Sequence, residues 1–280
     1  MSEKVVLITG ATGQQGGALA RSLAGKGFKL RGLTRKPEGD AAKKLSALGV
    51  ELVRGDLDDA ASLKQALQGV WGVFGVQNTW EAGVEKEEAQ GIQLAKLARE
   101  ASVSHYVYAS VGSADEKTGI PHFDNKSRVE DVVRSLGFPS HFISRPVFFM
   151  ENVMGPWFLQ GDKLMAGLKP DTKVQMVAVE DIGRVNAQAF IQSDKLNRRE
   201  VDIAGDNLSM NTVAAALSAK LGKPITFVSL PIEAVRQNSA DMAAMLEWFE
   251  AVGYSADIPA LDAEFGKMLS FEAWLKKLAV

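Results

Sequence analysis

Three glycines near the N-terminus have a spacing that suits the binding of a pyrophosphate. The segment 10–17 (GATGQQGG) directly follows an apolar run and precedes a helical pattern. Glycines there let the chain turn tightly and approach a phosphate with bare backbone, while the helix N-terminus offers unpaired N–H groups. The alternative is a glycine-rich connection without a ligand, but the position between a first strand and a first helix favours a phosphate loop. The expected cofactor contacts are Gly10, Thr12, Gly13, Gln14, Gln15 and Gly16.

The end of the second predicted strand bears on which dinucleotide is bound. NAD sites usually carry an acid about 20 residues past the glycines, which accepts hydrogen bonds from the ribose hydroxyls. Here the strand ends in Thr34-Arg35-Lys36, with no acid in that position. A guanidinium can hold a 2′-phosphate through two parallel hydrogen bonds and stack on adenine, whereas the alternative is a solvated basic turn. The sequence therefore predicts NADP(H), with Arg35 as the main contact and Lys36 as an auxiliary one.

Polar residues also follow the third, fourth and fifth predicted strands. Asp56 is placed to accept a hydrogen bond from the adenine amino group, while Asp58 and Asp59 are better suited to cap the next helix. Each of these residues alone fits ordinary loop chemistry equally well. Their shared position favours ligand binding, because ligands of parallel sheets bind at the carboxyl ends of the strands. The expected contacts from these strand ends are Asp56, Leu57, Gln77, Asn78 and Ser110.

A parallel sheet would bring these strand ends together, and the pattern of the first half of the chain predicts one. Short β-rich runs alternate with helical patterns, which is typical of βαβ units with helices on both faces of the sheet. Right-handed crossovers then give an α/β fold with a doubly wound Rossmann sheet. The predicted strands are 5–9, 29–34, 51–54, 72–76, 106–110 and 141–145, and the predicted helices are 15–26, 40–48, 60–67, 84–101 and 126–136.

The pattern becomes irregular after Pro146. We expect a strand over 174–179, a helix capped by Asp181 that runs to residue 191, and a final helix after Ser270. Two further helices, 210–221 and 232–252, bracket a strand at 225–228. The predicted division is an NADP(H)-binding Rossmann domain over 1–150 and a smaller, mostly helical lobe over 151–280. This lobe is expected to interleave with the last strands of the sheet and to cover a substrate or partner site.

Composition excludes several classes of function. The chain has 280 residues, a net charge of -2 and no stretch of concentrated basic residues, which argues against direct binding to nucleic acid. Cysteine is absent, so disulfides and thiolate chemistry are excluded, and three scattered histidines predict no metal site. No apolar run approaches the roughly 18 residues of a membrane span. The N-terminal apolar run is too short for a signal peptide, so we expect a soluble, cytoplasmic protein.

The motifs together resemble those of the NmrA-like family of atypical short-chain dehydrogenases/reductases, and most of all its redox-sensor branch. The family includes NADP-sensing regulators that bind other proteins, and reductases of quinones and similar acceptors. The resemblance thus implies a redox sensor or regulator that retains a reductase-type site; the alternative is a reductase of quinones, imines or carbonyls. The matching segments are 10–16, 34–37, 55–59, 78–81, 122–126 and 145–152.

The resemblance also identifies candidate catalytic residues. The wider superfamily uses a Tyr-x-x-x-Lys pair, in which the lysine holds the nicotinamide ribose and lowers the pKa of the tyrosine. This sequence keeps the lysine and replaces the tyrosine, as His122-x-x-x-Lys126, and Ser110 is the candidate serine. A histidine can act as an acid near neutral pH, or it can fill space beside the cofactor. The other histidines, His105 and His141, fit ordinary strand-edge residues.

Large apolar residues are concentrated just after the sixth predicted strand. They can line an apolar pocket over the nicotinamide, where an aromatic acceptor would stack, or they can form the core between the two lobes. The resemblance implies that this segment closes over the cofactor, with contacts from Pro146 and Phe148. The apolar residues are Phe148, Phe149, Met150, Trp157 and Phe158. The polar residues Glu151 and Asn152 lie between Met150 and Trp157.

Overall fold

The computed structural model describes residues 3–278, which form two compact units. Unit 1 contains the residues up to Ser110, Asn125–Arg145 and Ile182–Val201, and unit 2 contains Val111–Asp124, Pro146–Asp181 and the residues from Asp202 on. Within residues 3–278, no helix has both the length and the apolar character needed to cross a membrane.

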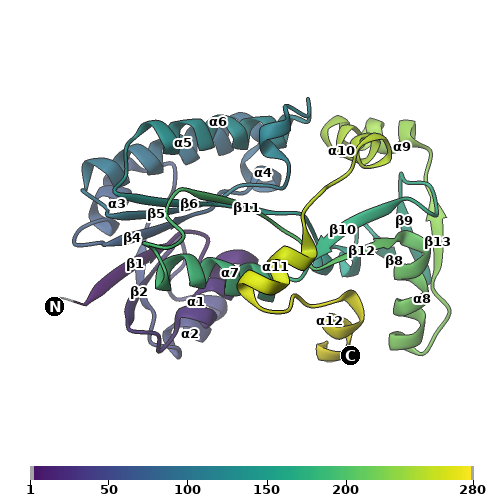
Figure 1. Cartoon of the computed structure of the whole chain (residues 1–280), viewed down its shortest axis with the longest axis horizontal. Coiled ribbons are helices and arrows are strands. Elements are labelled where there is room, and N and C mark those ends of the chain that lie inside the picture. Colours follow the sequence, from purple (N-terminus) through teal and green to yellow (C-terminus); the bar gives the residue numbers. More distant parts are fainter. Residues whose placement is uncertain (1–2, 279–280) are drawn as a thin grey trace. The chain divides into compact units, whose positions relative to one another are not determined.

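A seven-stranded sheet organises unit 1 (Figure 1), with the strand order β11-β6-β5-β4-β1-β2-β3. Strands β1 to β6 pair in parallel. The order reverses beside β1, so the predicted doubly wound α/β sheet is confirmed and the carboxyl ends of β1, β2 and β4 lie next to one another. The strands are β1 (Lys4–Ile8), β2 (Phe28–Thr34), β3 (Glu51–Arg54), β4 (Gly72–Gly75), β5 (His105–Ala109), β6 (Ser140–Pro146) and β11 (Arg199–Ile203).

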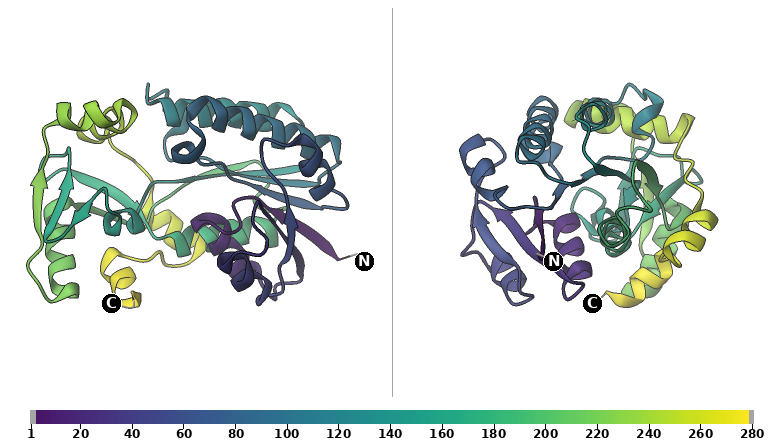
Figure 2. Two further views of the ribbon diagram at one scale, coloured as in Figure 1. Left: turned by 180° about the vertical axis from the view of Figure 1, so that it is seen from behind. Right: turned by 60° about the vertical axis from the view of Figure 1, so that its left-hand side comes forward.

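Helices cover both faces of this sheet, as Figures 1 and 2 show. Helices α3, α5 and α6 pack on one face, where Leu63, Leu94 and Val129 join the sheet residue Val73 in a buried cluster. Helices α1, α2 and α7 lie on the other face. The helices are α1 (Gln14–Leu23), α2 (Asp40–Ser46), α3 (Ala60–Ala66), α4 (Thr79–Ala82), α5 (Val84–Glu100), α6 (Pro121–Ser135) and α7 (Val179–Ile191).

Unit 2 combines two three-stranded sheets with helices around one apolar core, in the orders β12-β10-β7 and β13-β9-β8. The strands are short, β7 (Phe148–Phe149), β8 (Leu159–Gln160), β9 (Lys163–Ala166), β10 (Lys173–Val177), β12 (Asp206–Ser209) and β13 (Thr226–Ser229). The helices are α8 (Met210–Leu221), α9 (Ile232–Asn238), α10 (Ala240–Ala251), α11 (Ile258–Phe265) and α12 (Phe271–Lys277), with 3₁₀ turns at Ala114–Glu116 and Met150–Met154.

Capping side chains explain where several helices differ from the sequence-based prediction. The helix predicted over 232–252 is two helices, because the Ser239 hydroxyl accepts a hydrogen bond from the Met242 N–H and starts a new helix. Asp181 was wrongly predicted to cap α7. It lies inside the first turn, and its carboxylate accepts instead from the Leu269 N–H at 2.7 Å. The predicted cap of the last helix by Ser270 is confirmed.

Candidate functional site

The glycine segment forms a tight turn between β1 and α1. Gly10 has a φ of +55°, and a Cβ placed on Gly16 would lie 2.4 Å from the Gly10 carbonyl oxygen, so only glycine fits at position 16. The Thr9 hydroxyl accepts from the Val76 N–H at 2.8 Å and thereby ties the turn to the end of β4. Gly13 precedes the helix, and no side chain of residues 3–278 caps it. The first N–H groups of α1 are thus presented at the carboxyl edge of the sheet, where a phosphate would bind.

The side chains expected to assist this loop surround it. Thr12 and Gln14 are exposed, whereas Gln15 is half-buried. This exposure leaves Thr12 and Gln14 accessible to a bound phosphate, while the close contact between Gly16 and Gly10 keeps the backbone turn fixed. The loop therefore offers backbone N–H groups and no charged side chains of its own, which would suit a pyrophosphate.

Arg35 lies at the end of β2, as predicted, and pairs with a carboxylate that sequence reasoning missed. Its Nη2 donates to Glu81 of α4, and this hydrogen bond raises the pKa of the Arg35 guanidinium. Both side chains are largely exposed. The Arg35 carbonyl oxygen accepts from Arg54 Nη1 at 3.0 Å, and Arg54 pairs with Glu38 at 2.6 Å. Lys36 is exposed beside them.

The residues that follow β3 make hydrogen bonds within the protein that stabilise the turn and the start of α3. Asp56 Oδ1 accepts from the Asp58 N–H at 3.0 Å, and the Leu57 carbonyl accepts from Gln93 on α5. Asp59 caps α3, which confirms its predicted role. Asp58 was wrongly predicted to share that role, since its carboxylate pairs with Lys86 and Gln90 on α5. Those contacts lower the pKa of Asp58.

A buried carboxylate holds the candidate lysine in unit 1. Glu87 of α5 is 1% exposed, and it accepts from Lys126 Nζ at 2.6 Å and from Asn125 Nδ2 at 2.8 Å. The Thr79 hydroxyl donates to the same carboxylate. Burial by itself would raise the pKa of Glu87, but the Lys126 ammonium and these hydrogen bonds outweigh it and hold the pKa below its usual value. Lys126 is thus fixed by an ionised partner.

Sequence reasoning did not find Glu87, although one signal was present. Glu87, Gly91, Leu94 and Ala98 are all buried and lie on one side of α5. A carboxylate at the first position of this otherwise apolar stripe breaks the helical pattern, and buried acids are rare unless they are paired. The partner itself comes from α6 and could not be assigned from spacing along the chain.

His122 lies one helical turn before Lys126 on α6 and has its own carboxylate partner in unit 2. Its Nδ1 is 2.5 Å from Asp241 Oδ2, and its backbone N–H donates to Asp241 Oδ1 at 3.1 Å. The ring is buried against Phe123 in an edge-to-face contact. The imidazole nitrogen Nδ1 and the carboxylate oxygen that it contacts are both buried.

Three of the cofactor contacts predicted at strand ends differ in whether their polar atoms have hydrogen-bond partners. Asn78 caps α4, since its Oδ1 accepts from the Trp80 N–H at 3.1 Å. The Ser110 hydroxyl is buried and has no hydrogen-bond partner among residues 3–278. The same is true of both amide atoms of Gln77 within the described part of the chain. A buried polar group without a partner is costly, so Ser110 and Gln77 are places where a ligand or water would be favourable.

The aromatic segment after β6 is divided between core and surface. Phe148 packs edge-to-face on Phe158 and Phe249, and Met150 is fully buried in the core of unit 2. The small apolar cavity bounded by these rings has no room for a water molecule. The contacts support the core interpretation for Phe148, whereas Trp157 is 78% exposed. The Pro146 carbonyl accepts a hydrogen bond from the Gly112 N–H.

The remaining histidines are buried within the sheet. His105 Nδ1 lies 2.9 Å from the Ser140 hydroxyl, and the His105 ring stacks on Trp71. Burial and the neighbouring His141 lower the pKa of His105 to about 3. Both histidines lie at strand starts, as predicted, but they are buried and not at an exposed edge. No group of three possible metal ligands occurs within residues 3–278.

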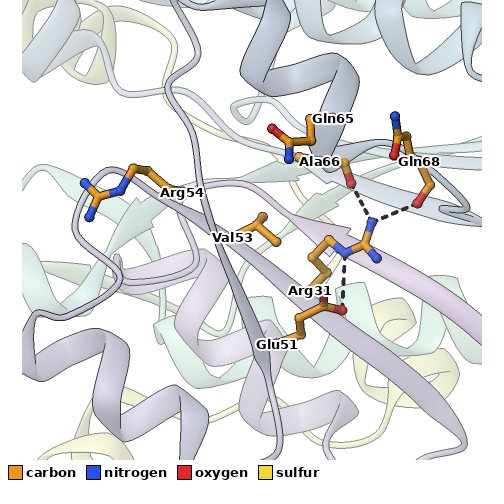
Figure 3. Close-up of a pocket in the computed structure, with 7 residues that line it drawn as sticks. All are labelled: Arg31, Glu51, Val53, Arg54, Gln65, Ala66 and Gln68. Atoms are coloured by element: carbon orange, nitrogen blue, oxygen red, sulfur yellow. Dashed lines mark hydrogen bonds and ion pairs between the residues drawn. The ribbon is translucent and has the colours of Figure 1, made fainter.

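A groove of about 420 Å³ lies along β2, β3 and α3, and Arg31 is one of the residues that line it (Figure 3). Arg31 Nη1 donates to the carbonyls of Ala66 and Gln68 at 2.8 and 2.9 Å, and its Nε is 3.4 Å from Glu51. These carbonyls lie at the C-terminal end of α3, where backbone carbonyls lack partners within the helix. The groove is therefore explained by an arginine that caps a helix end, and it is lined by none of the predicted cofactor contacts.

The sheet order and the glycine turn define a Rossmann-type α/β protein, and comparison with known proteins identifies its family. The chain belongs to the NmrA-like family, which it matches over residues 2–275. An NmrA-like family domain-containing protein of Dictyostelium discoideum is 26% identical, over 99% of this chain and 98% of that protein. The (4-alkanoyl-5-oxo-2,5-dihydrofuran-3-yl)methyl phosphate reductase of Streptomyces griseus is 31% identical, over 83% and 79% of the two chains.

Solved structures share the fold over nearly the whole chain. NmrA, a negative transcriptional regulator, in complex with NADP aligns with a TM-score of 0.82 at 21% identity, over 99% of this chain and 96% of that one. Its complex with NAD gives the same TM-score at 22% identity and the same coverage. The NADPH-dependent quinone oxidoreductase QOR2 of Escherichia coli aligns with a TM-score of 0.80 at 22% identity, over 97% and 98%. These similarities confirm the predicted fold.

Proposed function

We propose that the chain binds NADP(H) through unit 1. The observation that carries this proposal is the turn before α1, where Gly16 leaves no space for a side chain and the helix N-terminus has no side-chain cap within residues 3–278. Such a terminus is suited to a pyrophosphate. Arg35 and Lys36, at the end of the adjacent strand β2, supply the positive charge that a 2′-phosphate requires. The solved complexes of NmrA with NADP and with NAD support the binding of a nicotinamide dinucleotide.

We further propose that the chain is a reductase. Bound NADPH would supply a hydride. Lys126, fixed in place by Glu87, would donate hydrogen bonds to the ribose hydroxyls, while His122, which contacts Asp241, would provide the proton that follows the hydride. The acceptor class we propose is a quinone or conjugated carbonyl, since the Streptomyces relative is named a reductase and the Escherichia coli neighbour a quinone oxidoreductase.

A redox-sensing regulator is the second candidate. One observation favours it, namely that a histidine, His122, stands where the wider superfamily has a tyrosine, four residues before Lys126. A site with this change can keep its cofactor without turning over a substrate. NmrA, which shares the fold, is described as a transcriptional regulator. In this function the bound dinucleotide would order a surface that a partner protein recognises.

Two measurements on the purified protein separate these possibilities. Calorimetric titration with NADPH and NADH tests cofactor binding, and failure of both to bind would refute the proposed function. Oxidation of NADPH, followed at steady state with a panel of quinones, imines and aldehydes, then tests catalysis. Turnover of any acceptor supports the reductase. Binding without turnover, together with a change in partner binding between the cofactor-free and cofactor-bound protein, supports the regulator.

A further inference from the structure

The guanidinium that the proposed function assigns to the 2′-phosphate already has a carboxylate partner. Arg35 Nη2 is paired with Glu81 Oε1, and the two side chains are 60% and 54% exposed. We propose that Glu81 is a specificity-determining residue, whose carboxylate competes with the 2′-phosphate for Arg35 and keeps the preference for NADPH over NADH small. This inference rests on the proposed binding of NADP(H).

The fold of α4 holds Glu81 in this position. The helix is a single turn, and its start is fixed because Asn78 Oδ1 accepts from the Trp80 N–H at 3.1 Å. Next to it, the Thr79 hydroxyl donates to the buried carboxylate of Glu87, which belongs to α5. The backbone that carries Glu81 is therefore anchored to the core of unit 1. The pair with Arg35 follows from this anchoring and not only from the chance meeting of two long exposed side chains.

Two further cations near Arg35, Arg54 and Lys86, also pair with carboxylates. Arg54 donates to the Arg35 carbonyl at 3.0 Å and pairs with Glu38 at 2.6 Å. Lys86 pairs with Asp58 at 2.6 Å, and Asp58 also acts electrostatically on Arg35. A dianion that approaches this end of β2 thus meets, apart from Lys36, cations that already have carboxylate partners. The favourable field for a 2′-phosphate is correspondingly weaker than the number of basic residues would indicate.

The two dinucleotides make different demands on this pair. NADH carries a 2′-hydroxyl, so it requires no new partner for Arg35, and the contact with Glu81 can persist. NADPH adds a phosphate, so the pair must open or leave the Glu81 carboxylate beside a second anion. Exposed ion pairs are individually weak and are screened by salt. The competition should therefore change the affinity for NADPH about 3- to 10-fold and not by orders of magnitude.

Replacement of the carboxylate by an amide of the same shape tests this inference. Calorimetric titration of Glu81→Gln should show NADPH bound about 3- to 10-fold more tightly than by the wild type, with the affinity for NADH changed less than about twofold. Glu85→Gln is the matched control, because Glu85 is an exposed acid in the first turn of α5 and is not bonded to Arg35. Its ratio of affinities should equal that of the wild type. In an Arg35→Gln background, the effect of Glu81→Gln should disappear.

The other possible results refute either the proposed function or only the competition between Glu81 and the 2′-phosphate. If the wild type binds neither cofactor, both the proposed function and this inference are refuted. If it binds them but Glu81→Gln leaves the ratio unchanged, or if Glu85→Gln raises the ratio equally, only the competition is refuted. A loss of NADPH affinity in Glu81→Gln would also refute it, because Glu81 would then orient Arg35 for the phosphate.

Discussion

Two carboxylates that lie close together in the sequence, Glu81 and Glu87, pair with cations in opposite environments. Glu81 meets Arg35 at the surface, where both side chains are more than half exposed. Glu87 meets Lys126 in the interior, where their side chains are 2% and 11% exposed. A surface pair opens at little cost, whereas a buried pair must stay together because either charge alone would be left without solvent. The exposed pair is therefore suited to selecting a ligand, and the buried one to fixing a residue in place.

The largest effect is expected from breaking the buried pair. Glu87→Gln leaves the Lys126 ammonium buried without a counter-ion, which should destabilise the protein by about 3–5 kcal/mol. Glu81→Gln, at the surface, should cost less than about 1 kcal/mol. Thermal unfolding of both variants beside the wild type measures the difference. Equal midpoints for the two variants would show that burial does not distinguish these pairs.

A smaller effect is expected when the exposed cation is reversed. Arg35→Glu removes the donor to the 2′-phosphate and supplies a carboxylate that can accept from a ribose hydroxyl. The affinity for NADPH should fall by about 10- to 150-fold, equivalent to roughly 1.5–3 kcal/mol, while that for NADH should hold or rise. Titration calorimetry with both cofactors measures it. Parallel losses for NADPH and NADH would mean that Arg35 does not read the phosphate.

Acid should remove part of the advantage of the buried pair. Because the folded protein holds the pKa of Glu87 below its usual 4.5, the unfolded chain binds the proton more readily. The stability that Glu87 contributes is thus complete above pH 4.5 and is lost as the pH falls through the lowered pKa of the folded state. The gap in unfolding midpoint between the wild type and Glu87→Gln should narrow below that pH. A gap that is as wide in acid as at neutral pH would contradict this account.

The comparison also shows what a sequence can reveal. The glycine turn and Arg35 were predicted because each depends on neighbours along the chain, namely a strand, a turn and a helix. The partners of Arg35 and Lys126 were not, since Glu81 and Glu87 lie 46 and 39 residues away from them. Only the tertiary fold brings α4 to β2 and α5 to α6.

Two short strands and one helix break were also missing from the sequence-based prediction. Strands β7 and β8 have two residues each, too few to show an alternating pattern, and they exist because neighbouring strands pair with them. The break at Ser239 was missed because the residues on both sides keep a helical pattern, and the capping bond to Met242 alone divides it. The sequence identified His122 as the residue that replaces a tyrosine. It could not identify the partner Asp241, because that residue is 119 positions away along the chain.

NADPH binding by a pair of glycine variants tests whether the turn before α1 holds the cofactor. Gly16→Ala places a methyl group 2.4 Å from the Gly10 carbonyl oxygen, which should distort the turn that presents the helix N-terminus. Gly17→Ala is the matched control, because its methyl group would lie 3.3 Å from the nearest atoms. Calorimetry, with circular dichroism to check folding, should show NADPH bound by the wild type and Gly17→Ala, and binding lost in a folded Gly16→Ala. Undiminished binding by Gly16→Ala, or none by the wild type, would contradict the account.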